Sequence, residues 1–289
     1  MNDDRFSIAN VSTMSEADIA LILVADESKS LAPRKGTEHG PRAMRHAFNN
    51  SEVFRREGKT ILICPMRNSH FNKRILDLGF TSRNDLYSLI YKLATNRIVP
   101  VIIGGDHSVT TIAIDAISAI LGRIGLTYFD AHPDFVSSKT DYYGSVITDS
   151  LDRLDGTNVT FIGTRASEKE EVENIQRNGF QVISPLDVLE EGISKTIDKI
   201  CSKNLSKKYV SIDLDCLDPA FAPGVSVPTP CGLSSVELTC LVKHAVHSGI
   251  LGMDIVELCP RYDINSMTAS LAARLLSESI ASMRSGYLD

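Results

Sequence analysis

Apolar residues in this chain fall into short continuous runs separated by longer stretches in which apolar and polar residues mix. Short apolar runs bounded by glycine, proline or polar residues are typical of strands that are buried on both faces. This pattern predicts strands at Ile19–Val24, Thr60–Cys64, Ile98–Ile103, Leu126–Phe129, Asn158–Ile162, Gln181–Ser184, Tyr209–Leu214 and Leu251–Leu258.

The mixed stretches between these runs have the spacing of helices, with apolar residues three or four positions apart. Ser82 opens one such stretch, and Ser234 is a suitable N-cap for another. The helices are expected at Arg42–Phe48, Ser82–Asn96, Val109–Leu121, Glu168–Asn178, Pro185–Lys203, Ser234–Ser248 and Asn265–Met283.

Strands and helices thus alternate along the whole chain, which favours an α/β fold with a mostly parallel sheet and helices on both faces. With about eight strands, the same order also suits a closed (β/α)8 barrel, and periodicity does not separate the two folds. The 289 residues contain no linker, low-complexity tract or internal repeat, so we expect one domain over residues 1–289.

The charge and the lengths of the apolar runs argue against nucleic-acid and membrane partners. The net charge is −6 and no run of lysine and arginine occurs, which argues against nucleic acid. The apolar runs are far too short to span a membrane, and the first residues lack the pattern of a signal peptide. The six cysteines are scattered, as expected of reduced thiols. We therefore expect a cytoplasmic protein without nucleic-acid or membrane partners.

One stretch, from Leu126 to Asp134, runs from apolar residues into three strong metal-ligand types. Asp130, His132 and Asp134 occupy alternate positions, so on an extended strand they would point to one side. Taken alone, the stretch is either a strand that ends in a polar turn at Pro133 or a metal site at the carboxyl end of an α/β sheet.

Polar signatures at three other strand ends favour the metal site, because the carboxyl ends of parallel strands meet at one edge. The residues concerned are His107, Asp130, His132, Asp134, Asp213, Asp215 and Glu257. Each aspartate taken singly is more simply a cap or turn residue. Such a set at successive strand ends indicates a shared site.

The ligand types of this set suit two divalent ions. Carboxylates favour manganese, magnesium or calcium over zinc, and the two histidines favour manganese among these. Two such ions can share a water and lower its pKa to near neutral, which makes a hydroxide nucleophile. The residues therefore predict two Mn²⁺ per chain.

Several segments of the chain resemble the signatures of the arginase/agmatinase (ureohydrolase) family. They are Gly104–Ser108, Asp130–Asp134 and Ser211–Gly224, with Gly36–Arg45 and Gly252–Glu257 similar to the family's first segment and last strand. The resemblance covers nearly the whole chain. It implies an arginase-like three-layer α/β/α fold, rather than a barrel, and a binuclear manganese site.

The resemblance also implies roles for individual residues. The ligands of one ion would be His107, Asp130, Asp134 and Asp213. Those of the other would be His132, Asp130, Asp213 and Asp215. Asp130 and Asp213 would bridge the ions, and Asp134 would also steady the nucleophile. Glu257 would bind the substrate guanidinium, a planar cation that a carboxylate pairs with bidentately.

The implied reaction is attack of metal-bound hydroxide on a guanidinium carbon, with release of an amine and urea. Arginases carry a longer loop with a Ser-Gly-Asn run after the central motif, and the loop Phe135–Tyr143 is shorter and lacks that run. Phe161–Glu171 resembles the agmatinase segment. Agmatine, giving putrescine, is therefore the favoured substrate, and arginine, a guanidino acid or formimidoylglutamate are alternatives. A homo-oligomer, a trimer or hexamer, is expected from the resemblance.

The chain departs from the family pattern at two places near the expected substrate mouth. Tyr143 stands where most members carry a histidine, and Val225–Val227 replaces a Thr-Gly-Thr run. A tyrosine has an ordinary pKa near 10, so it is a weak proton shuttle at neutral pH but can still donate a hydrogen bond. Tyr143 is either a modified catalytic residue or a residue that packs at the rim. Two rival functions are a hydrolase for another C–N bond and a metal-binding protein without catalysis.

Overall fold

The computed structural model describes residues 5–51, 53–56, 59–62, 73–137, 139–201 and 207–287. The strands of the main sheet are β1 (Ile19–Leu23), β4 (Ile75–Phe80), β5 (Val99–Ile103), β6 (Ile124–Phe129), β7 (Leu154–Ile162), β8 (Gln181–Ile183), β9 (Lys208–Asp213) and β10 (Gly252–Val256). They lie in the order β4-β1-β5-β10-β9-β6-β7-β8. Every neighbouring pair is parallel.

The sheet is open. In the described part of the chain β4 and β8 form its two edges and do not pair with each other, so the (β/α)8 barrel is excluded. The prediction of a three-layer α/β/α fold with about eight parallel strands is confirmed. β9 and β10, the last strands of the chain, lie between β5 and β6.

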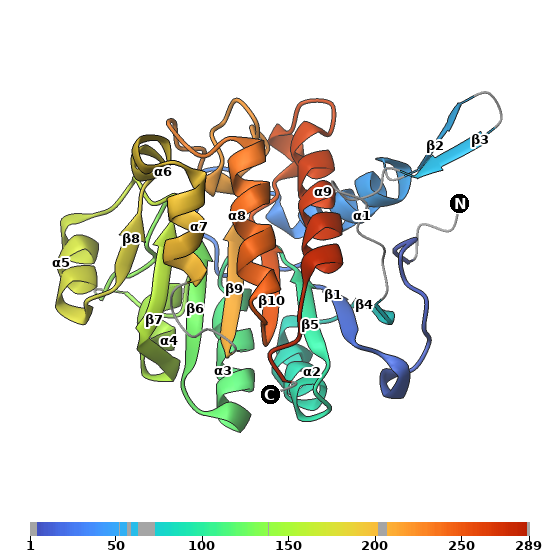
Figure 1. Ribbon diagram of the computed structural model, residues 1–289, viewed down its shortest axis with the longest axis horizontal. Helices are drawn as coiled ribbons and strands as arrows, with labels where there is room; N and C mark the ends of the chain where they lie inside the picture. The colour runs from blue at the N-terminus through green and yellow to red at the C-terminus, as the bar shows by residue number, and fades with distance from the viewer. Residues whose placement is uncertain are drawn as a thin grey trace.

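Helices cover both faces of the sheet (Figure 1). One layer contains α1 (Gly40–Ser51), α6 (Pro185–Glu191), α7 (Ile193–Cys201), α8 (Ser235–His247) and α9 (Met267–Ser282). The other contains α2 (Arg83–Thr95), α3 (Val109–Leu121) and α4 (Val146–Ser150), while α5 (Lys169–Asn178) lies at the β8 end of the sheet. Among the described residues, no helix is both long and apolar enough to cross a membrane.

Side-chain caps fix where the predicted helices begin. The Ser82 hydroxyl accepts the backbone N–H of Asp85 at 3.2 Å, and the Ser234 hydroxyl accepts that of Glu237 at 3.2 Å. Each pair satisfies an N–H group that the first helical turn leaves unbonded. The predicted helix Pro185–Lys203 is interrupted at Gly192, and residues 202–203 lie outside the described part.

The predicted sheet strand Thr60–Cys64 is wrong in its location. Its described residues belong to β3 (Lys59–Leu62), which pairs antiparallel with β2 (Val53–Arg56). This hairpin stands apart from the main sheet in Figure 1. Residues 63–64 lie outside the described part.

The edge strand that pairs with β1 is instead β4, which carries a buried aspartate, Asp77. Asp77 accepts the backbone N–H of Phe6 at 2.7 Å and that of Gly79 at 2.8 Å. Its carboxylate is therefore satisfied inside the fold, although a charged residue interrupts the apolar run that would have revealed the strand.

The four central strands are completely buried, from β5 through β10 and β9 to β6. Burial on both faces explains why their sequences read as continuous apolar runs. Their carboxyl ends meet at one edge of the sheet, and the loops that follow them carry the candidate functional residues.

Candidate metal centre and active site

The carboxyl edge of the central strands brings the predicted residues together around one cavity of about 400 Å³. Its predicted lining residues are Asp130, His132, Asp134, Tyr143, Asp213, Asp215 and Glu257. His107, which follows β5, lies fully buried beside this cluster. The structure thus unites residues that lie up to 150 positions apart in the chain.

Gly105 shapes the turn that presents His107. A Cβ atom at this position would lie 1.9 Å from the carbonyl oxygen of Asp26, so only glycine fits. The Gly105 carbonyl in turn accepts the backbone N–H of Glu257 at 2.9 Å. One turn therefore places both His107 and Glu257.

His107 faces three carboxylates through its Nδ1 atom. That nitrogen lies 3.1 Å from Asp130 Oδ2, 3.3 Å from Asp134 Oδ2 and 3.3 Å from Asp213 Oδ2. His107, Asp130 and Asp134 form one buried group whose ligand atoms are close enough to hold a single metal ion.

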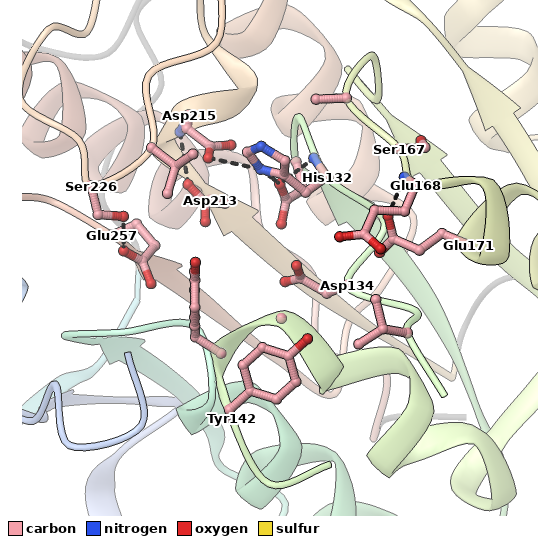
Figure 2. A pocket seen from close by; sticks show the side chains of 16 residues that line it. His132, Asp134, Tyr142, Ser167, Glu168, Glu171, Asp213, Asp215, Ser226 and Glu257 are labelled. Atoms are coloured by element: carbon pink, nitrogen blue, oxygen red, sulfur yellow. Dashed lines mark hydrogen bonds and ion pairs between the residues drawn. The ribbon is translucent and has the colours of Figure 1, made fainter. Parts of the chain in front are cut away.

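A second such group contains Asp130, His132 and Asp215. His132 Nδ1 lies 3.4 Å from Asp130 Oδ1 and 3.1 Å from Asp215 Oδ2. Asp130 therefore directs one carboxylate oxygen to each histidine, the arrangement expected of a bridging ligand. Asp213 contacts His107, and its other oxygen accepts the Asp215 N–H at 2.8 Å (Figure 2).

The carboxylates of this cluster need positive charge, from protons or cations, to balance their negative charge. Burial lowers the pKa of His132, but the Asp215 and Asp130 carboxylates outweigh it and raise that pKa to about 12. Burial and the Asp215 and Asp134 charges raise the pKa of Asp130 to about 6. Carboxylates packed this closely are stable only when protons or cations lie between them.

The residues present fit a pair of divalent ions. Asp130 Oδ2 is buried and accepts no hydrogen bond from the described residues, so it has a free ligand atom beside His107. The donor set of imidazole and carboxylate groups is the one that Mn²⁺ favours.

Glu257 lies at the inner wall of the cavity, directly after β10. It is 1% exposed, and its backbone has a φ of 66°, a left-handed conformation that side chains rarely adopt. Its Oε1 accepts the His107 N–H at 2.8 Å, and its Oε2 accepts the Ser226 hydroxyl (Figure 2). Burial raises the pKa of Glu257 to about 8, so the ionised carboxylate calls for a cationic partner.

Tyr143 lines the cavity together with Tyr142, and both residues are partly buried. Its backbone N–H donates to the Lys29 carbonyl at 3.2 Å, and Lys29 Nζ forms an ion pair with Asp141 of the same loop. Burial, with the Asp134 and Glu257 charges, raises the pKa of Tyr143 to about 12. The side chain therefore stays protonated at neutral pH.

The outer wall carries two further carboxylates, Glu168 and Glu171, at the start of α5 (Figure 2). Glu171 accepts the backbone N–H of Phe135 at 3.0 Å and that of Glu168 at 2.8 Å. The sequence analysis did not single out either residue as part of a site. The sequence signal was a capping box, in which Glu168 is the N-cap of α5 and Glu171 lies in its first turn.

Comparison with known proteins shows the family of the chain. A sequence model of the arginase family matches residues 17–281. The chain belongs to the arginase family.

Three relatives of this arginase-family chain illustrate the likeness. A human mitochondrial guanidino acid hydrolase is 30% identical over 200 residues, which cover 66% of this chain and 57% of that protein. An agmatinase from Escherichia coli is 33% identical over 181 residues, which cover 61% of this chain and 56% of the agmatinase. The crystal structure of an agmatine ureohydrolase from Thermoplasma volcanium superposes with a TM-score of 0.81 at 30% identity, covering 96% of this chain and 94% of that one.

These matches place the chain in the arginase family, among relatives named as agmatinases and a guanidino acid hydrolase. The matched segment spans less than two thirds of the length of the curated relatives.

The arginase-family site also has a buried polar network that the sequence analysis missed in part. His107 Nε2 lies 2.8 Å from the Ser211 hydroxyl, which donates to Asp254 Oδ1 at 2.7 Å. Asp254 Oδ2 accepts hydrogen bonds from Thr110 and Tyr209. The signal was present for Ser211, since it lies two residues before Asp213 on the same face of β9.

Proposed function

We propose that this chain is an agmatinase that hydrolyses agmatine to putrescine and urea with two Mn²⁺ ions. His107, Asp130, Asp134 and Asp213 would hold one ion, and His132, Asp130, Asp213 and Asp215 the other. When bound, the ions would supply a water of lowered pKa as the nucleophile. The two metal-capable groups that share Asp130 support this ligand assignment.

The negative charge of the cavity lining is the observation that favours agmatine as the substrate. Four of its lining carboxylates, those of Asp130, Asp134, Asp213 and Asp215, would be balanced by the two ions, and the remaining ones are those of Glu168, Glu171 and Glu257. Among the described lining residues there is no lysine or arginine. Agmatine carries a positive charge at each end and no carboxylate, whereas arginine and guanidino acids bring an anion that would meet this acidic wall without a cationic partner.

Glu257 would bind the guanidinium at the inner end of the cavity. Its carboxylate is held in place by the His107 N–H and the Ser226 hydroxyl. A planar cation beside a fixed carboxylate can pair with it through two N–H groups, which also sets the orientation of the central carbon. Glu168, exposed at the outer wall, would attract the distal ammonium.

Asp134 would hold the proton released by the nucleophile, since its carboxylate both belongs to the His107 group and lines the cavity. Water adds to the guanidinium carbon, the C–N bond to the butyl chain breaks, and the leaving nitrogen takes a proton to depart as an amine. Tyr143 would donate a hydrogen bond at the rim. Its raised pKa makes it a poor proton relay at neutral pH.

The test is urea release by the Mn²⁺-loaded protein from a panel of substrates: agmatine, arginine, 4-guanidinobutyrate and formimidoylglutamate, with formamide followed for the last. We expect agmatine to give the highest kcat/KM. A preference for a guanidino acid would assign the chain to that alternative. Absence of turnover with every compound, with two ions bound, would identify a metal-binding protein without this catalysis.

Location and assembly are proposed on the family resemblance alone. A cytoplasmic homo-oligomer, a trimer or hexamer, is the expected form of the enzyme. Light scattering of the purified protein would determine the oligomeric state.

A further inference from the structure

Tyr128 is a fully buried tyrosine in β6 that the proposed function does not use. Its hydroxyl lies 2.6 Å from Asp134 Oδ2 and 3.1 Å from His107 Nδ1. Its ring stacks on the His107 imidazole, with the ring centroids 4.8 Å apart and the planes within 4°. One side chain therefore contacts two of the proposed metal ligands.

The hydrogen-bond network shows which atom donates to which. The Ser211 hydroxyl gives its only hydrogen to Asp254, so it accepts from His107 Nε2–H. With a proton on Nε2, the lone pair of Nδ1 would be available to a metal ion. Since a carboxylate oxygen only accepts hydrogen bonds, the Tyr128 hydroxyl directs its hydrogen to Asp134 Oδ2.

This hydrogen bond distinguishes the two oxygens of Asp134. Oδ2 receives the Tyr128 hydroxyl and lies 3.3 Å from His107 Nδ1, inside the buried group. The side chain of Asp134 also lines the cavity (Figure 2). The backbone of Asp134 is left-handed, with a φ of 49°, so the loop alone is a strained support for this carboxylate.

We propose that Tyr128 is a positioning residue of the metal centre. Its hydroxyl fixes Oδ2 of Asp134 as the oxygen that joins the buried ligand group and leaves Oδ1 for the cavity. Its ring stacks on the His107 imidazole and keeps the two rings parallel. The inference rests on the proposed metal site but not on the identity of the substrate.

The test is the variant Tyr128→Phe, which keeps the ring and removes the hydroxyl. Outer-shell partners of metal ligands typically contribute 10- to 100-fold in affinity. We expect the Mn²⁺ dissociation constant of one site to rise by about that factor while the other stays unchanged, in a calorimetric titration with Mn²⁺ alone. The electron paramagnetic resonance spectrum of the Mn²⁺-loaded variant should also change. Tyr287→Phe is the matched control, because that buried hydroxyl donates to the Leu251 carbonyl instead.

A double-mutant cycle with Asp134→Ala separates positioning from a general loss of packing. If Tyr128 acts through Asp134, Tyr128→Phe should have no further effect on Mn²⁺ affinity in the Asp134→Ala background. Additive effects would overturn the proposal, as would wild-type affinity and an unchanged spectrum in Tyr128→Phe itself. Because the titration contains no substrate, a wild-type protein that binds two ions and does not hydrolyse agmatine would refute the proposed activity and leave this inference intact.

Discussion

The substitution Glu257→Gln removes the negative charge at the proposed guanidinium site and keeps the shape of the side chain. In the native protein one carboxylate oxygen accepts the His107 N–H and the other accepts the Ser226 hydroxyl. The glutamine oxygen can keep the first bond, and the Ser226 hydroxyl can rotate to accept from the new amide. The variant should therefore fold and bind both metal ions as before.

The expected loss comes from the missing charge. Glu257 is 1% exposed, so a guanidinium bound beside it is shielded from water. Truncating one partner of a buried, hydrogen-bonded charge pair costs about 2–5 kcal/mol. At about 1.4 kcal/mol for each factor of ten, this is a decrease of about 30- to 5,000-fold in kcat/KM for agmatine.

Steady-state urea release, with Mn²⁺ content measured on the same samples, provides the assay. Glu237→Gln is the matched control, because Glu237 also accepts a backbone N–H, from Ser234 at 2.8 Å, and does not line the cavity. An unchanged kcat/KM in Glu257→Gln would refute the reasoning. Loss of activity together with loss of metal would show instead that Glu257 supports His107 rather than the substrate.

Three further predictions concern metal, protons and stability. Asp130→Ala should lose both ions, because Asp130 faces both histidines, whereas Asp215→Ala should weaken one; equal metal loss, measured by elemental analysis, would contradict the bridging assignment. Tyr143→His should gain rate near neutral pH and Tyr143→Phe should not, because the native pKa of about 12 keeps the tyrosine protonated; one shared pH–rate profile would exclude Tyr143 from proton transfer. Lys208→Met should raise the free energy of unfolding by about 3 kcal/mol at neutral pH, because burial lowers the pKa of Lys208 to about 8 and its Nζ has no hydrogen-bond partner among the described residues. That gain should disappear between about pH 8 and pH 10.5, where the proton is lost first from the folded and then from the unfolded chain; an equal gain in the exposed neighbour variant Lys207→Met would oppose this account.

The central fold was predictable because its strands are buried on both faces. β5, β6, β9 and β10 read as continuous apolar runs, and the order of strands and helices indicated a parallel sheet. β4 escaped prediction because its buried Asp77 is satisfied by Phe6, a partner 71 positions away in the chain. The hairpin of β2 and β3 has a strand-like sequence but pairs with itself.

The candidate ligands were predictable for a topological reason, since residues at the carboxyl ends of neighbouring parallel strands must share one edge. The supporting residues were not. Tyr128 and Ser211 lie inside buried strands, where a single polar residue looks like an interruption of an apolar run. His107 lies 104 positions from Ser211. Asp134 is only six positions from Tyr128, but the conformation of the loop after β6 decides whether the two side chains meet.

The position of β9 and β10 in the sheet has a consequence for synthesis of the chain. These strands are made last, yet they separate β5 from β6. A nascent chain that ends before Lys208 contains two half-sheets, one bordered by β5 and the other by β6, with unpaired backbone groups on each.

Each half-sheet also carries an incomplete part of the metal centre, with His107 beyond β5 and Asp130 beyond β6. The last quarter of the chain therefore joins the two half-sheets, and the same event brings the proposed metal ligands together. Since this closure depends on contacts between distant residues, we expect it to be the slow step of folding. Ribosome-stalled chains that end before β9 should be the ones most prone to aggregate, because their open strand edges can pair with other chains.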